Sequence, residues 1–421
     1  MATEAVDVTA ALADARSWLS AREGEVIALT SALIAAPSPN LPGDETAAAE
    51  VIERAIAHYD LPAPRLLAEQ PHRPNLIVRI DGAHPGPHLA ICGHLDTKPV
   101  GDDAIHEWRT DPFTPTIEGD RLYGLGSTDM KGACAAMVLA GAAFQQVKDR
   151  AAGSLSLIFT ADEEYGSHYG AGYLARQNAV EADEILLGEP AGVHEDWDAI
   201  RVVSRGMSGF RVMVQGTQTH SSLSDWLPTV NGVEAMANVL VALRRDLDLH
   251  YPEHPLCPTG PTVNLGVRTM GGVGYGVLPG HAEFWSDIRT TPGMTQQQLA
   301  ADIDAALEKI RPLVPGAEVT WEFHDALGWM EPSEVLPGDP MVVAVQDEAR
   351  DVLGEAPPLA AFSGATDAYR FHVKGGVPTL AAFGPGLLTP AHGPNEWITL
   401  RSLQQAPHIF AAAALHYGAG A

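Results

Sequence analysis

The sequence predicts an α/β protein whose mostly parallel, mixed sheet has helices on both faces and whose chain contains an inserted ferredoxin-like βαββαβ domain. Apolar, strand-like runs alternate with Ala-rich helical stretches in the first half of the chain, as in parallel sheets. From about Gly206 the order changes to strand, helix, strand, strand, helix and strand. With 421 residues the chain also exceeds one ordinary domain. We therefore expect two domains.

The first domain begins with helical periodicity over residues 10–60, which is broken at residues 37–42. Four strand-like runs follow in the order NLIVRI, HLAICGH, SLSLIFT and EILLGE. In open α/β sheets the ligand crevice lies beyond the carboxyl ends of the strands. We therefore expect the polar residues that follow these runs to gather at one edge of the sheet.

The inserted domain is expected at residues 206–325, between two parts of the first domain at residues 1–205 and 326–421. Its second helix has a clear start signal, because Thr295 and Gln298 form a capping-box pattern. An apolar stripe follows at Leu299, Ile303, Leu307 and Ile310. After the insertion, the α/β pattern returns with a helix at residues 340–353, the strand GVPTLAAFG and a final helix from about Leu400.

Composition excludes several classes of partner. The chain has 26 Lys and Arg residues against 53 Asp and Glu residues, a net charge of −27 that repels nucleic acid and anionic membranes. It contains no run approaching 18 apolar residues and no signal-peptide pattern at its start. Its three cysteines are widely spaced, without a CxxC pair. We expect a soluble, cytoplasmic protein that binds neither nucleic acid nor anionic membranes.

Acidic and imidazole side chains follow the strand-like runs of the first domain. They are His94 and Asp96 in GHLDT, Asp162, Glu163 and Glu164 in TADEE, and Glu189 in GEP, joined by Asp129 in STDMK and His392 in AHGPNEW. Each alone has an ordinary structural explanation, such as a helix cap or a solvated strand end. Together they would repel one another unless cations neutralised them. Imidazole and carboxylate ligands without thiolate suit Zn²⁺, Co²⁺ or Mn²⁺.

The motifs GHLDTKP, GLGSTDMKGA, TADEEYGS, GEP and AHGPNEW occur in this order. Their combination resembles the di-zinc amidohydrolase and metallopeptidase family that includes acetylornithine deacetylase, succinyl-diaminopimelate desuccinylase, aminoacylase and glutamate carboxypeptidase. The resemblance spans nearly the whole chain, including GTQTHSS and SDIR in the insertion. It implies a di-zinc peptidase-like catalytic domain with an inserted lid and dimerisation domain.

The resemblance also implies two divalent ions, zinc in the first place and cobalt or manganese as alternatives. One ion would be bound by His94 and Glu189, the other by Glu164 and His392, and Asp129 would bridge them. Asp96 would orient the His94 ring. Glu163 would act as general base for a metal-activated water that attacks an amide carbonyl. If the segment is extended, Glu163 and Glu164 point to opposite sides.

In the insertion, the resemblance implies that His220 reaches across a homodimer interface and polarises the substrate carbonyl. Arg289 would clamp the α-carboxylate of the substrate, a task suited to a planar bidentate donor. The SGATD stretch would line the pocket, with Ser363 and Gly364 as substrate-binding candidates.

Two positions depart from the family pattern and bear on specificity. Leu125 stands between two glycines where relatives often have Arg, and Tyr275 with Gly276 precedes the VLP turn where relatives often have Asn. The second departure weakens a transfer of desuccinylase specificity. An N-acyl-L-amino-acid deacylase is the leading hypothesis, and a dipeptidase or carboxypeptidase is the alternative. A binding protein that has lost catalysis should lack a metal ligand or the base, whereas this chain has Glu163 and all five ligand positions. A nucleotide-binding protein is also disfavoured, because GLGSTDMKG fits neither a P-loop nor a dinucleotide fingerprint.

Overall fold

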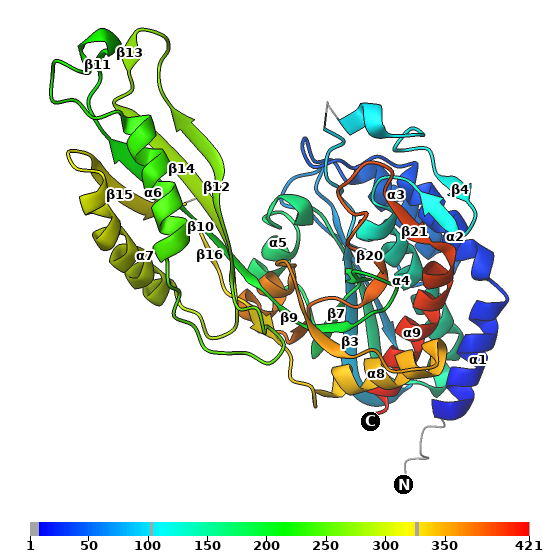
Figure 1. Cartoon of the computed structure of the whole chain (residues 1–421). Coiled ribbons are helices and arrows are strands. Elements are labelled where there is room, and N and C mark those ends of the chain that lie inside the picture. Colours follow the sequence, from blue (N-terminus) through cyan, green and yellow to red (C-terminus); the bar gives the residue numbers. More distant parts are fainter. Residues whose placement is uncertain (1–7, 102–103, 325–327, 421) are drawn as a thin grey trace. The chain divides into compact units, whose positions relative to one another are not determined.

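The computed structural model describes residues 8–101, 104–324 and 328–420. The chain forms two compact units: unit 1 comprises residues 1–204, 333–362 and 366–421, and unit 2 comprises residues 205–332 and 363–365 (Figure 1). The boundary expected between residues 325 and 326 lies outside the described residues. The short segment Ser363–Ala365 joins unit 2, although it is far from the insertion in sequence.

Unit 1 is built on a six-stranded mixed sheet with the order β1-β2-β6-β3-β7-β19. The four strands from β6 to β19 are parallel, and β1 and β2 are antiparallel to their neighbours. This arrangement confirms the expected mostly parallel sheet. The strands are β1 (Arg65–Leu67), β2 (Asn75–Asp81), β3 (His84–His94), β6 (Ala152–Thr160), β7 (Glu184–Leu187) and β19 (Thr379–Leu380).

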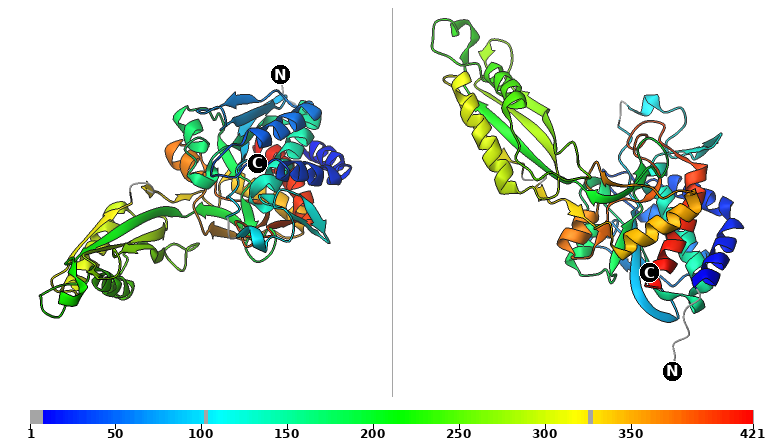
Figure 2. Two further views of the ribbon diagram at one scale, coloured as in Figure 1. Left: turned by 90° about the horizontal axis from the view of Figure 1, so that it is seen from above. Right: turned by 60° about the horizontal axis from the view of Figure 1, so that its bottom comes forward.

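Helices cover both faces of this sheet, as the sequence predicts. On one face lie α4 (Gly132–Val147) and α9 (Leu400–Gly418), and α1 (Val8–Ser20) and α2 (Glu23–Ile34) pack against both, as the blue and red helices of Figure 2 show. The Ala-rich α4 is almost wholly buried. Small side chains allow this close approach, since a Cβ at Gly141 would lie 2.7 Å from Leu157 Cδ1.

The opposite face carries α5 (Ala171–Arg176) and the helical turn Tyr369–Lys374, which pack on alternate residues of β3, β6 and β7. The described part of unit 1 also contains the α-helices α3 (Thr46–His58) and α8 (Pro340–Leu353). Three small sheets complete unit 1: β17 (Ser333–Glu334), β9 (Ile200–Ser204) and β18 (Leu359–Phe362); β20 (Gly384–Leu387) and β8 (Pro190–Gly192); and β21 (Trp397–Thr399), β5 (Arg121–Tyr123) and β4 (Thr116–Glu118).

Unit 2 has the βαββαβ order that the sequence predicts. Its elements are β10 (Gly206–Gln215), α6 (Gly232–Asp246), β12 (Thr262–Gly271), β14 (His281–Thr290), α7 (Gln296–Ile310) and β15 (Glu318–Phe323), with short strands β11 (Thr219–His220), β13 (Val277–Leu278) and β16 (Trp329–Met330). The antiparallel sheet has the order β12-β14-β10-β15, which is the ferredoxin-like arrangement. Its core lies between the two helices and the sheet and is separate from that of unit 1.

The cap of α7 only partly follows the expected capping box. Thr295 Oγ1 accepts the Gln298 N–H at 3.2 Å, as expected. The Gln298 side chain instead donates to Asp302 Oδ1 at 2.9 Å. The predicted stripe of α7 is buried against the sheet. Within the described part of the chain, none of the helices combines the length and apolar character needed to cross a membrane.

Candidate metal centre

The strand ends bring the acidic and imidazole side chains of unit 1 together. His94 and Thr160, the last residues of β3 and β6, are register partners in the parallel ladder. β7 pairs with β3 as far as Leu187, two residues before Glu189. The segments that follow all three strands therefore leave the sheet at the same edge, which is the position expected for a ligand crevice.

Two groups of side chains at this edge can hold a metal ion, and they share Asp129. In the first group, His94 Nε2 lies 3.0 Å from Asp129 Oδ1 and 3.8 Å from Glu189 Oε1. In the second group, His392 Nε2 lies 3.0 Å from both Asp129 Oδ2 and Glu164 Oε1. The structure thus brings together all five residues that the sequence nominates as ligands.

The hydrogen bonds of His94 fit a bound cation. Its Nδ1 faces the Asp96 backbone oxygen at 3.0 Å and Asp96 Oδ1 at 3.4 Å, which favours a proton on Nδ1. In the neutral ring, Nε2 then directs a lone pair at the carboxylates of Asp129 and Glu189. A cation between these groups removes the repulsion. The donor set of imidazole and carboxylate suits Zn²⁺, Co²⁺ or Mn²⁺.

The crowding of charge is also visible in the pKa values of the group. Burial raises the pKa of Glu189 well above its usual range, and the nearby charge of Asp129 raises it further. Burial alone would lower the pKa of His94, but its hydrogen bonds to Asp129 and Asp96 raise that pKa well above its usual value. Both shifts favour the protonated forms and so reduce the net negative charge of the cluster. A bound dication would neutralise this charge in place of the protons.

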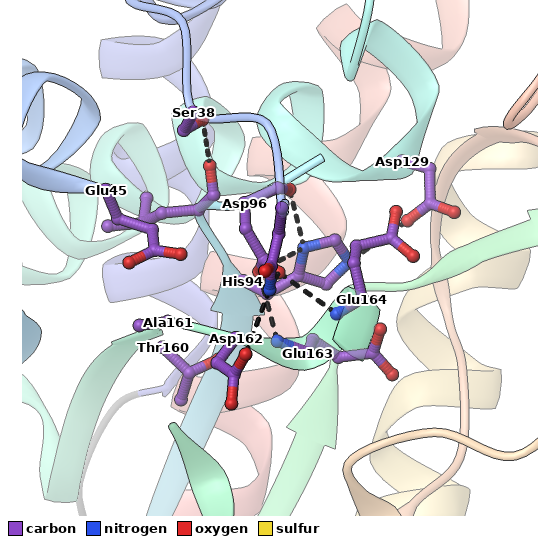
Figure 3. Close-up of polar contacts among 12 residues, drawn as sticks. Ser38, Glu45, His94, Asp96, Asp129, Thr160, Ala161, Asp162, Glu163 and Glu164 are labelled. Atoms are coloured by element: carbon purple, nitrogen blue, oxygen red, sulfur yellow. Dashed lines mark hydrogen bonds and ion pairs between the residues drawn. The ribbon is translucent and has the colours of Figure 1, made fainter. Parts of the chain in front are cut away.

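Asp96 has more contacts than orientation of His94 requires (Figure 3). Its Oδ1 accepts the Glu163 N–H at 3.1 Å, and its Oδ2 accepts the Glu164 N–H at 3.0 Å. Asn40 Nδ2 donates to the same Oδ2 at 2.9 Å. This fully buried carboxylate therefore positions His94 and the turn that carries both glutamates.

The glutamate pair lies in a helical turn, so the expectation of an extended segment is wrong. Residues Glu163–Tyr165 form one turn of 3₁₀-helix after Asp162, whose φ is 63°. Adjacent side chains on such a turn diverge by about 120° rather than pointing to opposite faces. The two N–H bonds to Asp96 explain the turn, because they draw successive amides toward one acceptor. Glu164 joins the second ligand group, and no hydrogen bond to the Glu163 carboxylate is found among the described residues.

A buried polar network holds the carboxylates of Asp96 and Asp162 in place. Its members were not predicted from the sequence. Asn40 Nδ2 also donates to Asp162 Oδ1 at 2.9 Å, and Arg73 Nη2 donates to Asn40 Oδ1 at 3.2 Å. Arg73 in turn pairs with Glu45 at 2.6 Å. Burial raises the pKa of Glu45 to about 7. The only sequence signal for this network is the position of Asn40, which lies in the break of the helical pattern at residues 37–42.

Lys98 is a further residue whose role the sequence did not indicate, although it lies in the GHLDTKP motif. Its Nζ is 2.9 Å from Glu164 Oε2, whereas Glu164 Oε1 faces His392. Lys98 therefore leaves one oxygen of Glu164 directed at the second ligand group.

The four remaining site candidates belong to unit 2. His220 is exposed in β11, and its Nδ1 accepts the Ser222 N–H at 3.2 Å. Arg289 in β14 donates to Asp287 Oδ2 at 3.2 Å. In the segment of Ser363 and Gly364, the Gly364 carbonyl accepts the Arg205 N–H at 3.0 Å. The substrate roles of these four residues stay predictions.

The model of peptidase family M20/M25/M40 matches residues 90–416, which is most of the chain and includes all five candidate ligands. The chain belongs to this family. It is 31% identical over 347 residues to a succinyl-diaminopimelate desuccinylase of Afipia carboxidovorans, covering 80% of this chain and 85% of that one. It is also 31% identical over 343 residues to an acetylornithine deacetylase of Photorhabdus laumondii, covering 80% of each chain.

Among solved structures, an M20 family metallo-carboxypeptidase from Sulfolobus solfataricus superposes with a TM-score of 0.74 at 21% identity, covering 94% of this chain and 99% of that chain. This match supports the fold, including the catalytic and lid domains. The family resemblance drawn from the motifs is thus confirmed. The chain is a metal-dependent hydrolase of the M20 family, and it carries two candidate metal-binding groups.

Proposed function

We propose that this M20 protein hydrolyses the amide bond of an N-acyl-L-amino acid, as a deacylase similar to acetylornithine deacetylase. One observation carries the proposal: two potential metal-binding groups share Asp129 beside a glutamate turn held by Asp96. The names of the relatives, a desuccinylase and a deacetylase, support an acyl amino acid as substrate.

The proposed ligands divide as the two groups do. His94 and Glu189 would hold one ion, Glu164 and His392 the other, and Asp129 both. Zinc is the proposed metal, with cobalt and manganese as alternatives, because the donors are nitrogen and oxygen. When bound, the ions would neutralise the clustered carboxylates and lower the pKa of a water molecule at the site.

Glu163 is the proposed general base. Its backbone N–H is fixed by Asp96, so the turn directs its side chain away from Glu164. With no hydrogen bond to its carboxylate among the described residues, both oxygens are available to take a proton from water. The same carboxyl group would later donate that proton to the leaving amine.

Unit 2 is proposed to supply substrate recognition and the dimer interface. Arg289 would bind the α-carboxylate, His220 would polarise the carbonyl of the substrate on the partner protomer, and Ser363 and Gly364 would line the pocket. The interface is proposed along β12, which is an edge strand of its sheet. Exposed apolar side chains follow one another there and in the next loop: Val267, Met270, Val273 and Tyr275.

A peptidase is the second candidate, because the superposing Sulfolobus protein is named a carboxypeptidase and a peptide is itself an N-acyl amino acid. The deciding experiment is a screen of N-acetyl, N-formyl and N-succinyl amino acids beside dipeptides, with Zn²⁺ or Co²⁺ added. The deacylase proposal expects a higher kcat/KM for an acyl amino acid than for every dipeptide. The reverse order would make the protein a peptidase. The three cysteines are free and buried, which suits the proposed cytoplasmic location.

A further inference from the structure

Glu396 is a buried carboxylate close to the candidate metal centre that has no assigned role. It is 1% exposed and lies four residues after His392. Its Oε2 accepts the Gly126 N–H at 3.0 Å, and its Oε1 accepts the N–H groups of Thr128 at 3.0 Å and Asp129 at 3.2 Å. One side chain thus collects three backbone donors from the segment that carries Asp129.

Glu396 ends a loop, residues 388–396, that carries His392. Leu387, just before this loop, is bonded to the same segment of Asp129. Thr128 Oγ1 donates to the Leu387 carbonyl at 3.0 Å and accepts the Leu387 N–H at 2.9 Å. Gly386 permits this approach, because its φ is 92° and a Cβ there would lie 2.2 Å from Thr128 Oγ1. The Gly124 N–H also donates to the Glu396 carbonyl at 3.0 Å.

His392 stands between these two attachments, five residues after Leu387 and four before Glu396. Its side chain is 46% exposed, so burial alone does not fix the loop around it. Asn395 also bonds Arg109 and Glu107. The contacts at Leu387 and Glu396, however, join the loop to the segment that carries Asp129. That relation sets the 3.0 Å separation of His392 Nε2 and Asp129 Oδ2.

We propose that Glu396 is a positioning residue for the second metal-binding group: it fixes the Asp129 backbone against the His392 loop and thereby sets the metal affinity of Asp129, Glu164 and His392. The inference rests on the proposed function, in which these residues bind a metal. It goes further by assigning this task to a residue outside both ligand groups. Glu396 reaches the first group only through Asp129, since the other two members, His94 and Glu189, follow β3 and β7.

Glu396→Gln tests the geometry directly. Both carboxylate oxygens of Glu396 accept backbone N–H groups, and the amide replaces one acceptor by an NH₂ donor. At least one buried N–H then faces a donor. Glu396→Asp is the second variant, because it keeps the charge but is one methylene too short to reach all three donors.

Glu348→Gln is the matched control. Glu348 is also buried, but it pairs with Arg16 at 2.8 Å and with His416 at 3.0 Å instead of contacting the ligand segments. It should lower the thermal unfolding temperature without changing metal binding. A difference in metal affinity between the two Gln variants at similar unfolding temperatures separates positioning from general destabilisation.

The measurement is calorimetric titration of the metal-free protein with Zn²⁺, together with the visible spectrum of Co²⁺ added stepwise. We expect Glu396→Gln to weaken one of the two binding steps by about 10- to 100-fold and to alter the Co²⁺ spectral increment of that step. Wild-type affinity and spectrum in folded Glu396→Gln would overturn the proposal. If that variant does not fold, the same result for Glu396→Asp overturns it.

Failure of the proposed function gives a different result. A wild-type protein that binds two ions but cleaves no acyl amino acid contradicts the function and leaves the role of Glu396 intact. A wild-type protein that binds no second ion contradicts both.

Discussion

Asp129 directs its two carboxylate oxygens at two different imidazoles: Oδ1 lies 3.0 Å from His94 Nε2, and Oδ2 lies 3.0 Å from His392 Nε2. No other residue belongs to both groups that can hold a metal ion among the described residues. Removing Asp129 should therefore affect the binding of both metal ions, whereas removing a ligand that belongs to one group should affect one ion.

We predict that Asp129→Ala weakens binding of both metal ions, whereas His392→Ala weakens binding of one. The reason is that each ion loses a ligand in the first variant, and only the second ion does so in the other. Metal content after dialysis against a weak chelator, measured by mass spectrometry, checks this. Equal metal content in the two variants would contradict a shared ligand.

We predict that Glu163→Gln keeps both ions and loses hydrolysis by about 10²- to 10⁴-fold in kcat, the usual contribution of a general base. The Glu163 N–H bond to Asp96 involves the backbone and is unaffected by the substitution. Steady-state kinetics on the best acyl amino acid, with metal content as the control, decides. If the metal-loaded variant keeps the wild-type kcat, Glu163 is not the general base.

Arg289→Lys should raise KM by about 10- to 100-fold while kcat changes little, because a bidentate charge-assisted contact is lost and the charge is kept. Arg268→Lys is the control: Arg268 lies on the same sheet, stacked on Trp285 at 4.7 Å. An amide analogue of the substrate, which lacks the α-carboxylate, should be cleaved equally by wild type and Arg289→Lys. Equal KM values for the acid substrate would place the carboxylate elsewhere.

Stability should depend on pH through Glu184. Burial and the nearby carboxylate of Asp339 raise the pKa of Glu184 to about 8, from the usual 4.5. Because the folded state holds this proton more tightly, the stabilisation is complete below pH 4.5 and is lost as pH rises to about 8. Glu184→Gln mimics the protonated acid and still accepts from Tyr417.

The unfolding temperature of Glu184→Gln relative to wild type should therefore rise between pH 5 and about pH 8.5. Thermal melts in buffers of constant ionic strength measure this. A difference that stays constant over that interval would show that Glu184 ionises equally in the folded and unfolded states.

Val267→Asp combined with Met270→Asp should convert a dimer into monomers, because both side chains are exposed on the edge strand β12. Leu336→Asp, an equally apolar and 68% exposed position in unit 1, should leave the mass unchanged. Light scattering coupled to size exclusion gives the masses. A dimer in the double variant would place the interface elsewhere.

The ligand residues could be predicted from the sequence because each follows a strand or stands in a short motif, and parallel strands deliver such residues to one edge. His94 and Thr160 show this plainly, since they end neighbouring strands in register. The antiparallel order of unit 2 was likewise readable from the spacing of apolar runs. These features depend on local pattern and on rules of sheet topology.

The supporting contacts could not be predicted in the same way. Asn40 reaches Asp96 and Asp162 from 56 and 122 residues away, and Glu396 reaches Asp129 from 267 residues away. Such contacts involve backbone N–H groups or polar side chains with no periodicity. The turn at Glu163 was missed for a related reason, since acceptors on a distant segment determine it.

The two units have separate hydrophobic cores, and this separation has a consequence for engineering. The nominated metal ligands and Glu163 lie in unit 1, whereas His220 and the candidates for substrate binding, Arg289, Ser363 and Gly364, lie in unit 2. A chimera that combines unit 1 of this chain with unit 2 of a desuccinylase leaves the packing inside each core intact. Under the proposed roles of Arg289, Ser363 and Gly364, such a chimera should take the substrate preference of the desuccinylase that supplies unit 2.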